Sequence, residues 1–221
     1  MTTIKAAILP VSAFQQNCAI LWEESSKRAA IFDPGGDVPR ILESIAELEV
    51  IVEQIVLTHG HIDHAGGAAE LKEALDDQRG APVPVIGPDL RDRFLLEGLA
   101  EQGRMFGLTG ARAVTPDRWL EEGEEITIGD QRFDILHCPG HTPGHLIFVH
   151  EPGRFAVMGD VLFKGSIGRT DFPYGDHEAL IDAIQKKVIP LGDDLAFICG
   201  HGPGSTIGAE RASNPFIQTA R

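Results

Sequence analysis

Three histidines and an aspartate stand within six residues of this 221-residue chain, in the string His59-Gly60-His61-Ile62-Asp63-His64. The residues before it, 53–58 (EQIVLT), have the apolar pattern of a buried strand, and Ala68, Leu71 and Leu75 recur after it at helical spacing. The string therefore connects the C-terminal end of a strand to a helix. In layered α/β folds, functional sites are built at this edge of the sheet.

This string predicts a metal site. Imidazoles at positions i, i+2 and i+5 beside a carboxylate offer nitrogen and oxygen donors without a thiolate, a set that suits Zn, Fe or Mn. Three further candidates follow other predicted strands: His141 in CPGHTPGH, Asp160 in VMGDVLF and His201 in CGHG. With the string they supply five histidines and two aspartates, enough for two metal ions that share one carboxylate.

The rest of the chain alternates between strand and helix patterns. Short apolar runs from Ile4 to Phe32 predict two or three strands. A helix follows, with one apolar face formed by Ile41, Leu42, Ile45 and Leu48. Further strands are predicted at 82–87, 125–129, 132–137, 145–149, 154–160 and 195–200, and a helix at about 176–188. Residues 88–118 have a helical pattern whose packing the sequence does not assign. This order predicts an α/β fold with two packed sheets and helices outside, in a single domain over 1–221.

Composition disfavours several classes of partner. Lys+Arg 19 against Asp+Glu 33 gives a net charge of −14, which repels nucleic acids. No run approaches the ~18 to 20 apolar residues of a membrane span, and no signal-peptide pattern opens the chain. The three cysteines, Cys18, Cys138 and Cys199, are too few for a disulfide framework. We therefore expect a cytoplasmic protein without a nucleic-acid or membrane partner, and the sequence leaves its oligomeric state open.

The motifs THGHIDH, GHTPGH, GD and GHG, in this order after FDPGG, resemble those of the metallo-β-lactamase fold superfamily along essentially the whole chain. The strings GDVLFKGSIGRTDFP, CGHGPGSTIGAER and NPF are more narrowly similar to the short, bacterial-type glyoxalase II proteins, the hydroxyacylglutathione hydrolases. The resemblance implies a four-layer αββα sandwich with a dinuclear metal site at one edge. It implies two divalent ions, with Zn favoured over Fe or Mn.

Carried over position by position, the resemblance assigns every predicted ligand. It implies that the first metal is held by His59, His61 and His141. It implies that the second is held by Asp63, His64 and His201. Asp160 is then the bridging carboxylate, and Asp63 is also a candidate proton acceptor.

Residues outside this set are candidates for orienting ligands or binding substrate. Asp33 and Thr58 are expected to hydrogen-bond the ligand loop, since a metal-bound imidazole needs a partner for its other ring nitrogen. Arg169 could clamp a substrate carboxylate with its planar fork, and Lys164 and Tyr174 are candidate pocket residues. In contrast, His145, Cys138 and Cys199 are expected to be packed structural residues rather than ligands.

The chain departs from the full-length hydrolases in two places. About twenty residues follow His201, and Arg169 and Asp171 stand where those enzymes have Lys and Tyr. Both departures weaken the hypothesis that glutathione is the thiol of the substrate.

The leading functional hypothesis is hydrolysis of a thioester such as S-lactoylglutathione by a metal-bound hydroxide. Two divalent cations can lower the pKa of a shared water to near neutrality, and a thiolate leaves without obligatory protonation. The principal alternative is a persulfide dioxygenase with one iron, held by His59, His141 and Asp160 as a two-His-one-carboxylate triad. Lactonase, β-lactamase or other metallo-hydrolase activity, and a non-catalytic metal-binding module, are further alternatives.

Overall fold

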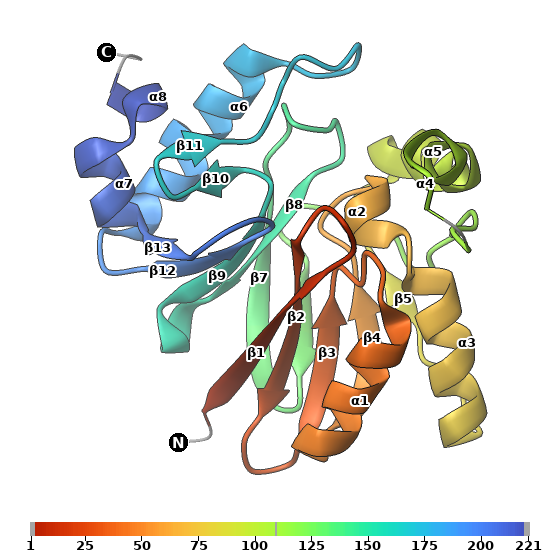
Figure 1. Ribbon diagram of the computed structural model, residues 1–221. Coiled ribbons are helices and arrows are strands. Elements are labelled where there is room, and N and C mark those ends of the chain that lie inside the picture. The colour runs from red at the N-terminus through yellow and green to blue at the C-terminus, as the bar shows by residue number, and fades with distance from the viewer. Residues whose placement is uncertain (1–2, 109, 219–221) are drawn as a thin grey trace.

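Two β-sheets pack face to face in the computed structural model, which describes residues 3–108 and 110–218 (Figure 1). Helices cover the outer face of each sheet, so that the layers run helix, sheet, sheet, helix. The predicted αββα sandwich is therefore confirmed. The single-domain boundary at 1–221 stays a prediction.

The first sheet has the strand order β1-β2-β3-β4-β5. β1, β2 and β3 form the predicted antiparallel meander, and β3, β4 and β5 run parallel. Parallel neighbours require crossover connections, and α1 and α3 provide them on the outer face. The bounds are β1 Ile4–Val11, β2 Gln16–Glu23, β3 Arg28–Phe32, α1 Val38–Leu48, β4 Ile51–Val56, α2 Ile62–Ala65, α3 Ala68–Arg79 and β5 Val85–Ile86.

The second sheet has the order β13-β12-β9-β8-β7-β6, with its outer face covered by α6 and α7. β9 and β12 are parallel, and the other neighbours are antiparallel. The strands of this sheet are β6 Glu125–Ile128, β7 Gln131–His137, β8 Leu146–His150, β9 Phe155–Gly159, β12 Ala196–Cys199 and β13 Ser205–Thr206. The other elements of this half of the chain are β10 Leu162–Phe163, β11 Ser166–Ile167, α6 His177–Ala183, α7 Ile207–Ser213 and α8 Pro215–Gln218.

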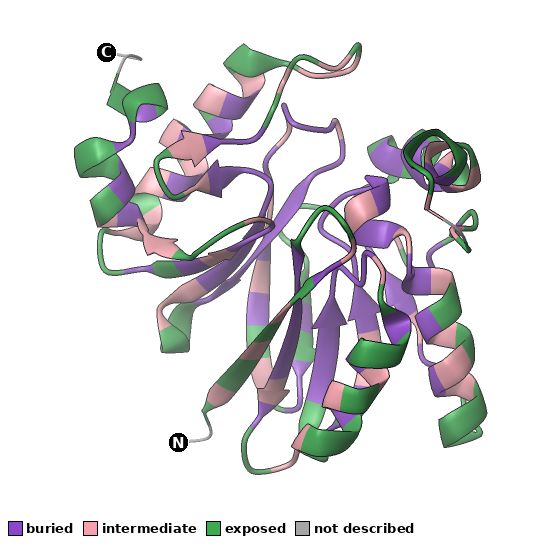
Figure 2. Cartoon of the chain, viewed as in Figure 1, coloured by how far each residue is buried: buried purple, intermediate pink, exposed green. Residues whose placement is uncertain are grey.

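Side-chain alternation along the strands sorts the apolar residues between two cores. In β3, Ile31 points to the helices and Phe32 to the facing sheet. Phe32 contacts Phe148 of β8 at 5.3 Å and Phe133 of β7 at 6.4 Å between ring centroids, which places aromatic rings between the sheets. Both faces of the central strands are buried (Figure 2), as their near-continuous apolar sequences require.

The helix predicted at 176–188 forms in two parts. It is regular in α6 and continues as a π-helical turn over Ile184–Val188. Leu180, Ile184 and Val188 are all buried against the second sheet, so the predicted apolar face is correct. The short elements β10, β11, β13, α7 and α8 have no counterpart in the sequence-based prediction.

Residues 88–118 are helical only in their first part. A 3-10 turn over Leu90–Asp92 leads into α4 (Arg93–Glu97) and α5 (Leu99–Phe106). The described residues that follow, up to residue 118, form no regular helix. α4 and α5 lie beside α2, at the edge of the sandwich where the histidine string stands (Figure 1). None of the described helices is long and apolar enough to span a membrane.

Candidate metal centre

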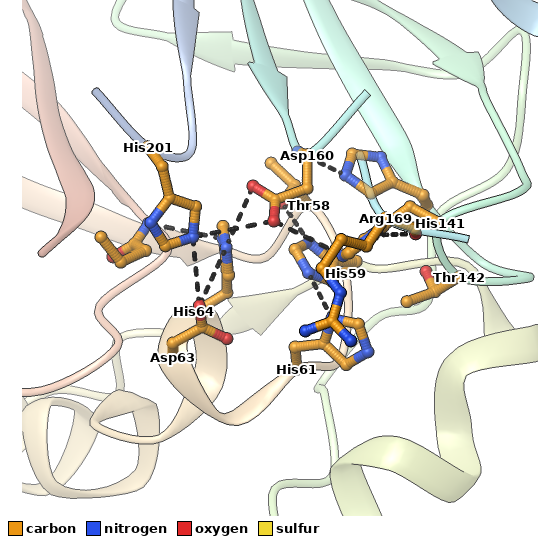
Figure 3. A network of polar contacts seen from close by, with 12 residues as sticks. Thr58, His59, His61, Asp63, His64, His141, Thr142, Asp160, Arg169 and His201 are labelled. Carbon is orange, nitrogen blue, oxygen red and sulfur yellow. Dashed lines mark hydrogen bonds and ion pairs between the residues drawn. The ribbon is translucent and has the colours of Figure 1, made fainter. Parts of the chain in front are cut away.

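The candidate ligands come from distant parts of the chain and meet at one edge of the sandwich (Figure 3). His59 and His61 follow β4, while Asp63 and His64 lie on α2. The remaining candidates stand just beyond β7, β9 and β12, and they are His141, Asp160 and His201. Strand ends converge here, so the layered fold brings together residues up to 142 positions apart, from 59 to 201.

His59, His61 and His141 form one group in which each residue offers a ring nitrogen within 4.8 Å of the others. Nε2 of His59 lies 3.1 Å from Nδ1 of His61. All three side chains are buried. A compact cluster of three imidazole nitrogens is a typical ligand set for a divalent transition metal.

Asp63, His64 and His201 form a second group of the same size. Nε2 of His201 lies 3.1 Å from Oδ2 of Asp63. Asp160 stands between the two groups: its Oδ2 lies 3.5 Å from Nε2 of His141 and 3.7 Å from Nε2 of His201, and its Oδ1 lies 3.3 Å from Nε2 of His64. A carboxylate in this position can reach both groups.

The other ring nitrogen of four histidines is held by a neighbouring group. Nδ1 of His59 contacts the Thr58 hydroxyl at 3.0 Å, and Nδ1 of His141 contacts the backbone oxygen of Arg169 at 2.8 Å. The two further contacts are His64 Nδ1 to Asp33 Oδ2 at 2.9 Å and His61 Nε2 to Tyr174 Oη at 2.8 Å. Each contact fixes the ring orientation and leaves the opposite nitrogen facing the cluster, which is the arrangement that metal-binding histidines require.

Asp33 ties the ligand loop to the first sheet. Its carboxylate accepts hydrogen bonds from the Thr58 backbone N–H and the Thr58 hydroxyl, both at 2.7 Å, in addition to its contact with His64. The hydrogen bonds predicted for Asp33 and Thr58 at the ligand loop are thus confirmed.

Several buried polar atoms at this centre make no hydrogen bond, although two of them, Nε2 of His64 and Oδ1 of Asp160, lie 3.3 Å apart as an ion pair. They include Nε2 of His64, Nε2 of His141 and Oδ1 of Asp160. Buried polar atoms are normally paired, because an unpaired one costs roughly 1–3 kcal/mol. All three belong to predicted ligands and lie where the two groups meet, so the residues present fit divalent metal ions.

The protonation states also fit metal binding. Burial, together with the neighbouring histidines, lowers the pKa of His61 to about 3 and that of His59 well below the usual value. These rings are therefore neutral at pH 7 and can donate a lone pair. Burial opposes the ionisation of Asp160, but His64 and His141 outweigh it and lower the pKa of this carboxyl. In His64, burial is outweighed by Asp160, Asp63 and Asp33, which raise its pKa, so a metal ion bound at this ring would displace a proton.

His145 supports the bridging position without belonging to either group. Its Nε2 accepts a hydrogen bond from the Asp160 backbone N–H at 2.9 Å, and its ring stacks on His59 at 4.7 Å. Gly159 makes this approach possible: it has φ 51°, and a Cβ there would lie 2.6 Å from the His145 ring. The expectation of a packed, hydrogen-bonded His145 is confirmed.

Asp92 is a structural partner of the centre that the sequence did not reveal. This fully buried carboxylate accepts hydrogen bonds from the backbone N–H of Gly60 at 2.9 Å, the Thr142 hydroxyl at 2.7 Å and the backbone N–H of Gly144 at 2.6 Å. Asp92 therefore joins the loop that carries His59 and the loop that carries His141. It stands in DLRDRF, where no motif or spacing distinguishes it from a helix-surface aspartate.

A cavity of about 580 Å³ opens onto the centre. His61, Asp63, His141, Asp160 and His201 form its floor, and the predicted substrate residues Arg169 and Tyr174 lie in its wall. The guanidinium of Arg169 already pairs with Asp171, with Nε to Oδ1 at 2.9 Å. Lys164 is exposed in the turn between β10 and β11 and is not among the described residues that line the cavity.

Replacing Tyr174 with phenylalanine tests the hydrogen bond to His61. We expect Tyr174→Phe to weaken metal binding by about 10-fold, because loss of a group that orients a metal ligand typically costs 10- to 100-fold. The aromatic wall of the cavity stays in place. Titration against a chelating dye measures the affinity. Thr170→Val, which removes a hydroxyl of the same loop that contacts His177 instead, is the matched control; equal affinities in both variants would contradict the role of Tyr174.

Comparison with known proteins agrees with this geometry. The sequence pattern of the metallo-beta-lactamase superfamily matches residues 11–201. The chain is 48% identical to hydroxyacylglutathione hydrolase GloC of Haemophilus influenzae, over 96% of this chain and 97% of that protein.

Two solved structures are similar over nearly their full length. The crystal structure of TTHA1623 in a di-iron-bound form has a TM-score of 0.84 and 36% identity, covering 95% of this chain and 99% of that one. The crystal structure of BLEG-1 B3 metallo-beta-lactamase has a TM-score of 0.84 and 34% identity, covering 97% and 99%. Together with the fold and the converging His and Asp side chains, these similarities show that the chain belongs to the metallo-beta-lactamase superfamily.

Proposed function

We propose that this protein is a dinuclear metal-dependent hydrolase that cleaves a thioester with water to give a carboxylic acid and a thiol. One observation carries the proposal: two ligand groups lie side by side, and the Asp160 carboxylate reaches both. The similarity to a hydroxyacylglutathione hydrolase supports a thioester as the substrate class.

The proposal assigns the first metal to His59, His61 and His141. It assigns the second to Asp63, His64 and His201, with Asp160 shared. Zinc is favoured for this nitrogen and oxygen donor set, and iron or manganese also suits it. Such ions, when bound by these residues, would lower the pKa of water toward neutrality and would polarise a thioester carbonyl.

The chain's own groups then position the reactants. Asp63 lines the cavity, so its carboxylate would accept the proton that water releases on attack. The thiol that leaves has a pKa of about 8.5, so the thiolate departs without a protein acid. Tyr174 and Arg169 stand in the wall of the same cavity and would contact the substrate.

Oxidation of a persulfide at a single iron is the second candidate. His59, His141 and Asp160 lie close enough to form the required triad. A related chain solved in a di-iron-bound form supports iron as the metal, although it holds two ions rather than one. The 48% identity to a hydroxyacylglutathione hydrolase over nearly the whole chain favours hydrolysis over this candidate.

Metal content and activity of the same sample separate these candidates. Elemental analysis of freshly purified protein is expected to find about two ions per chain, and the sample should hydrolyse S-lactoylglutathione or another thioester. One iron per chain with persulfide-dependent oxygen uptake would replace the hydrolase proposal by the dioxygenase.

Removal of the metal is expected to destabilise the fold. The ligand groups are brought together only by the folded chain, so a bound ion stabilises the folded state by about 2.7 kcal/mol at a concentration 100 times its Kd. For a chain of this size, this corresponds to a fall in Tm of roughly 5–10 °C after chelation. Thermal unfolding with chelator, and again after zinc is restored, measures the shift; an unchanged Tm would show that these groups hold no tightly bound ion.

A further inference from the structure

The wall of the cavity beside the metal centre is built mainly from apolar and aromatic side chains. It receives Phe14 from the turn between β1 and β2, Phe94 from α4, and Met105 and Phe106 from α5. Four of the eight large apolar side chains that stay exposed in the described part of the chain are these four residues. An apolar surface of this kind, gathered around one cavity, marks a binding site.

Aromatic rings connect this surface to the candidate ligands. Phe94 meets Tyr174 at 5.2 Å, Tyr174 stacks on Phe172 at 5.4 Å, and Phe172 lies 4.9 Å from the His61 ring. Phe14 and Phe106, which also line the cavity, meet edge to face at 5.5 Å. One chain of ring contacts therefore runs from Phe94 of α4 to the candidate ligand His61.

The charges of the lining do not match a glutathione moiety. Glutathione carries two carboxylates and one ammonium group, and carboxylates are bound most effectively by free Arg or Lys side chains. Arg169 is the sole Arg or Lys among the described lining residues, and its guanidinium is engaged by both oxygens of Asp171. The lining also carries Glu101, which repels a carboxylate.

We infer that the preferred substrate is a thioester with a bulky apolar group, alkyl or aromatic, on one side of the thioester bond. This inference rests on the proposed hydrolase function and specifies its substrate class. The volume of about 580 Å³ accommodates such a group beside the reacting carbonyl. Burial of the group would also cover the exposed rings of Phe94 and Phe106.

Two substrate series with uncharged ends test this inference on the metal-loaded protein. In the first, acetyl, butanoyl and hexanoyl groups are joined to N-acetylcysteamine. In the second, the acetyl group is kept and the thiol is N-acetylcysteamine or benzyl mercaptan. Each buried methylene is worth about fourfold in binding, so kcat/KM is expected to rise at least 10-fold from acetyl to hexanoyl, or at least 10-fold on going to the benzyl thiol. The series that responds identifies the side of the bond that enters the cavity.

A binding measurement that needs no turnover separates this inference from the proposed function. The thioethers S-ethyl- and S-hexyl-N-acetylcysteamine cannot be hydrolysed, and calorimetry is expected to show at least 10-fold tighter binding of the hexyl compound. A preference for hexyl without hydrolysis of any thioester would keep the apolar site and overturn the hydrolase. Hydrolysis with equal kcat/KM across both series would keep the hydrolase and overturn the inference.

Amino-acid substitutions in the cavity test whether its apolar side chains cause the preference for a bulky apolar group. Phe94→Ala combined with Phe106→Ala is expected to reduce the rise in kcat/KM along the responding series at least fivefold. Ile51→Ala, at the first residue of β4 and 52% exposed, removes an apolar side chain outside the cavity and should keep the wild-type ratio. A double variant with the wild-type ratio and an unchanged circular dichroism spectrum would overturn the assignment of the apolar group to this cavity.

Discussion

Asp160→Ala is expected to remove metal from both groups and to lower thioester hydrolysis by more than 100-fold. The side chain is almost fully buried, and its two oxygens lie within 3.3 to 3.7 Å of His64, His141 and His201. Loss of a group that merely orients a ligand costs about 10- to 100-fold, so loss of a shared ligand should cost more. Elemental analysis and kcat/KM on the same sample measure both effects.

The control for this variant is Asp77→Ala, which removes an exposed carboxylate from α3, away from the centre. It should keep the metal content and activity of the wild type. If Asp160→Ala lost one ion and kept the other, Asp160 would serve a single metal. If it kept both ions and full turnover, the shared-ligand assignment would be wrong.

Asp92→Ala is expected to destabilise the metal-free protein by about 3 kcal/mol, because a buried donor without an acceptor costs roughly 1–3 kcal/mol. Three donors would lose their acceptor at once: two backbone N–H groups, of Gly60 and Gly144, and the Thr142 hydroxyl. Urea unfolding in the presence of chelator measures the change. The ligand loops that Asp92 joins should also lose their relative position, so metal affinity should fall at least about 10-fold.

Asp89→Ala is the matched control for Asp92→Ala. Asp89 is also buried, three residues earlier, but its carboxylate contacts Arg91 rather than a ligand loop. Its loss should cost about 1 kcal/mol, as for a helix-capping residue, and leave metal affinity unchanged. Equal metal affinity in the two variants would contradict a positioning role for Asp92.

The effect of Asp92→Ala should also depend on pH. Burial raises the pKa of Asp92 from 3.8 to about 6, despite its hydrogen bonds to Thr142, Gly60 and Gly144. The folded protein therefore holds the proton of the Asp92 carboxyl more tightly than the unfolded chain does. The contribution of this proton to the free energy of unfolding is fully present below pH 4 and is lost as the pH rises through 6. The destabilisation by Asp92→Ala should thus be larger at pH 4 than at pH 7.5, by on the order of 2–3 kcal/mol. If Asp92→Ala lowered the free energy of unfolding by the same amount at both pH values, this would contradict the raised pKa of Asp92.

The elements nearest the histidine string were predicted well because their signals are local. A buried strand before His59 and a helical spacing after it are properties of neighbouring residues, and β4 and α3 form where these patterns stand. The same holds for the strands β6 to β9, whose apolar runs alternate with polar turns. The packing of residues 88–118 could not be predicted, for the opposite reason. The helices there are short, and their packing beside α2 depends on residues far away in the chain.

By itself, the sequence determined the layered α/β fold and identified the His and Asp side chains that the fold gathers at one edge. Spacing within a loop and position after a strand are enough for this, since strand ends meet at one edge of a layered sheet. Only the tertiary structure decided the distances at which Asp160 approaches both ligand groups, how Asp92 joins their loops, and that α4 and α5 supply an apolar wall for the cavity. These features depend on distances between side chains far apart in the chain, which periodicity and local spacing do not determine.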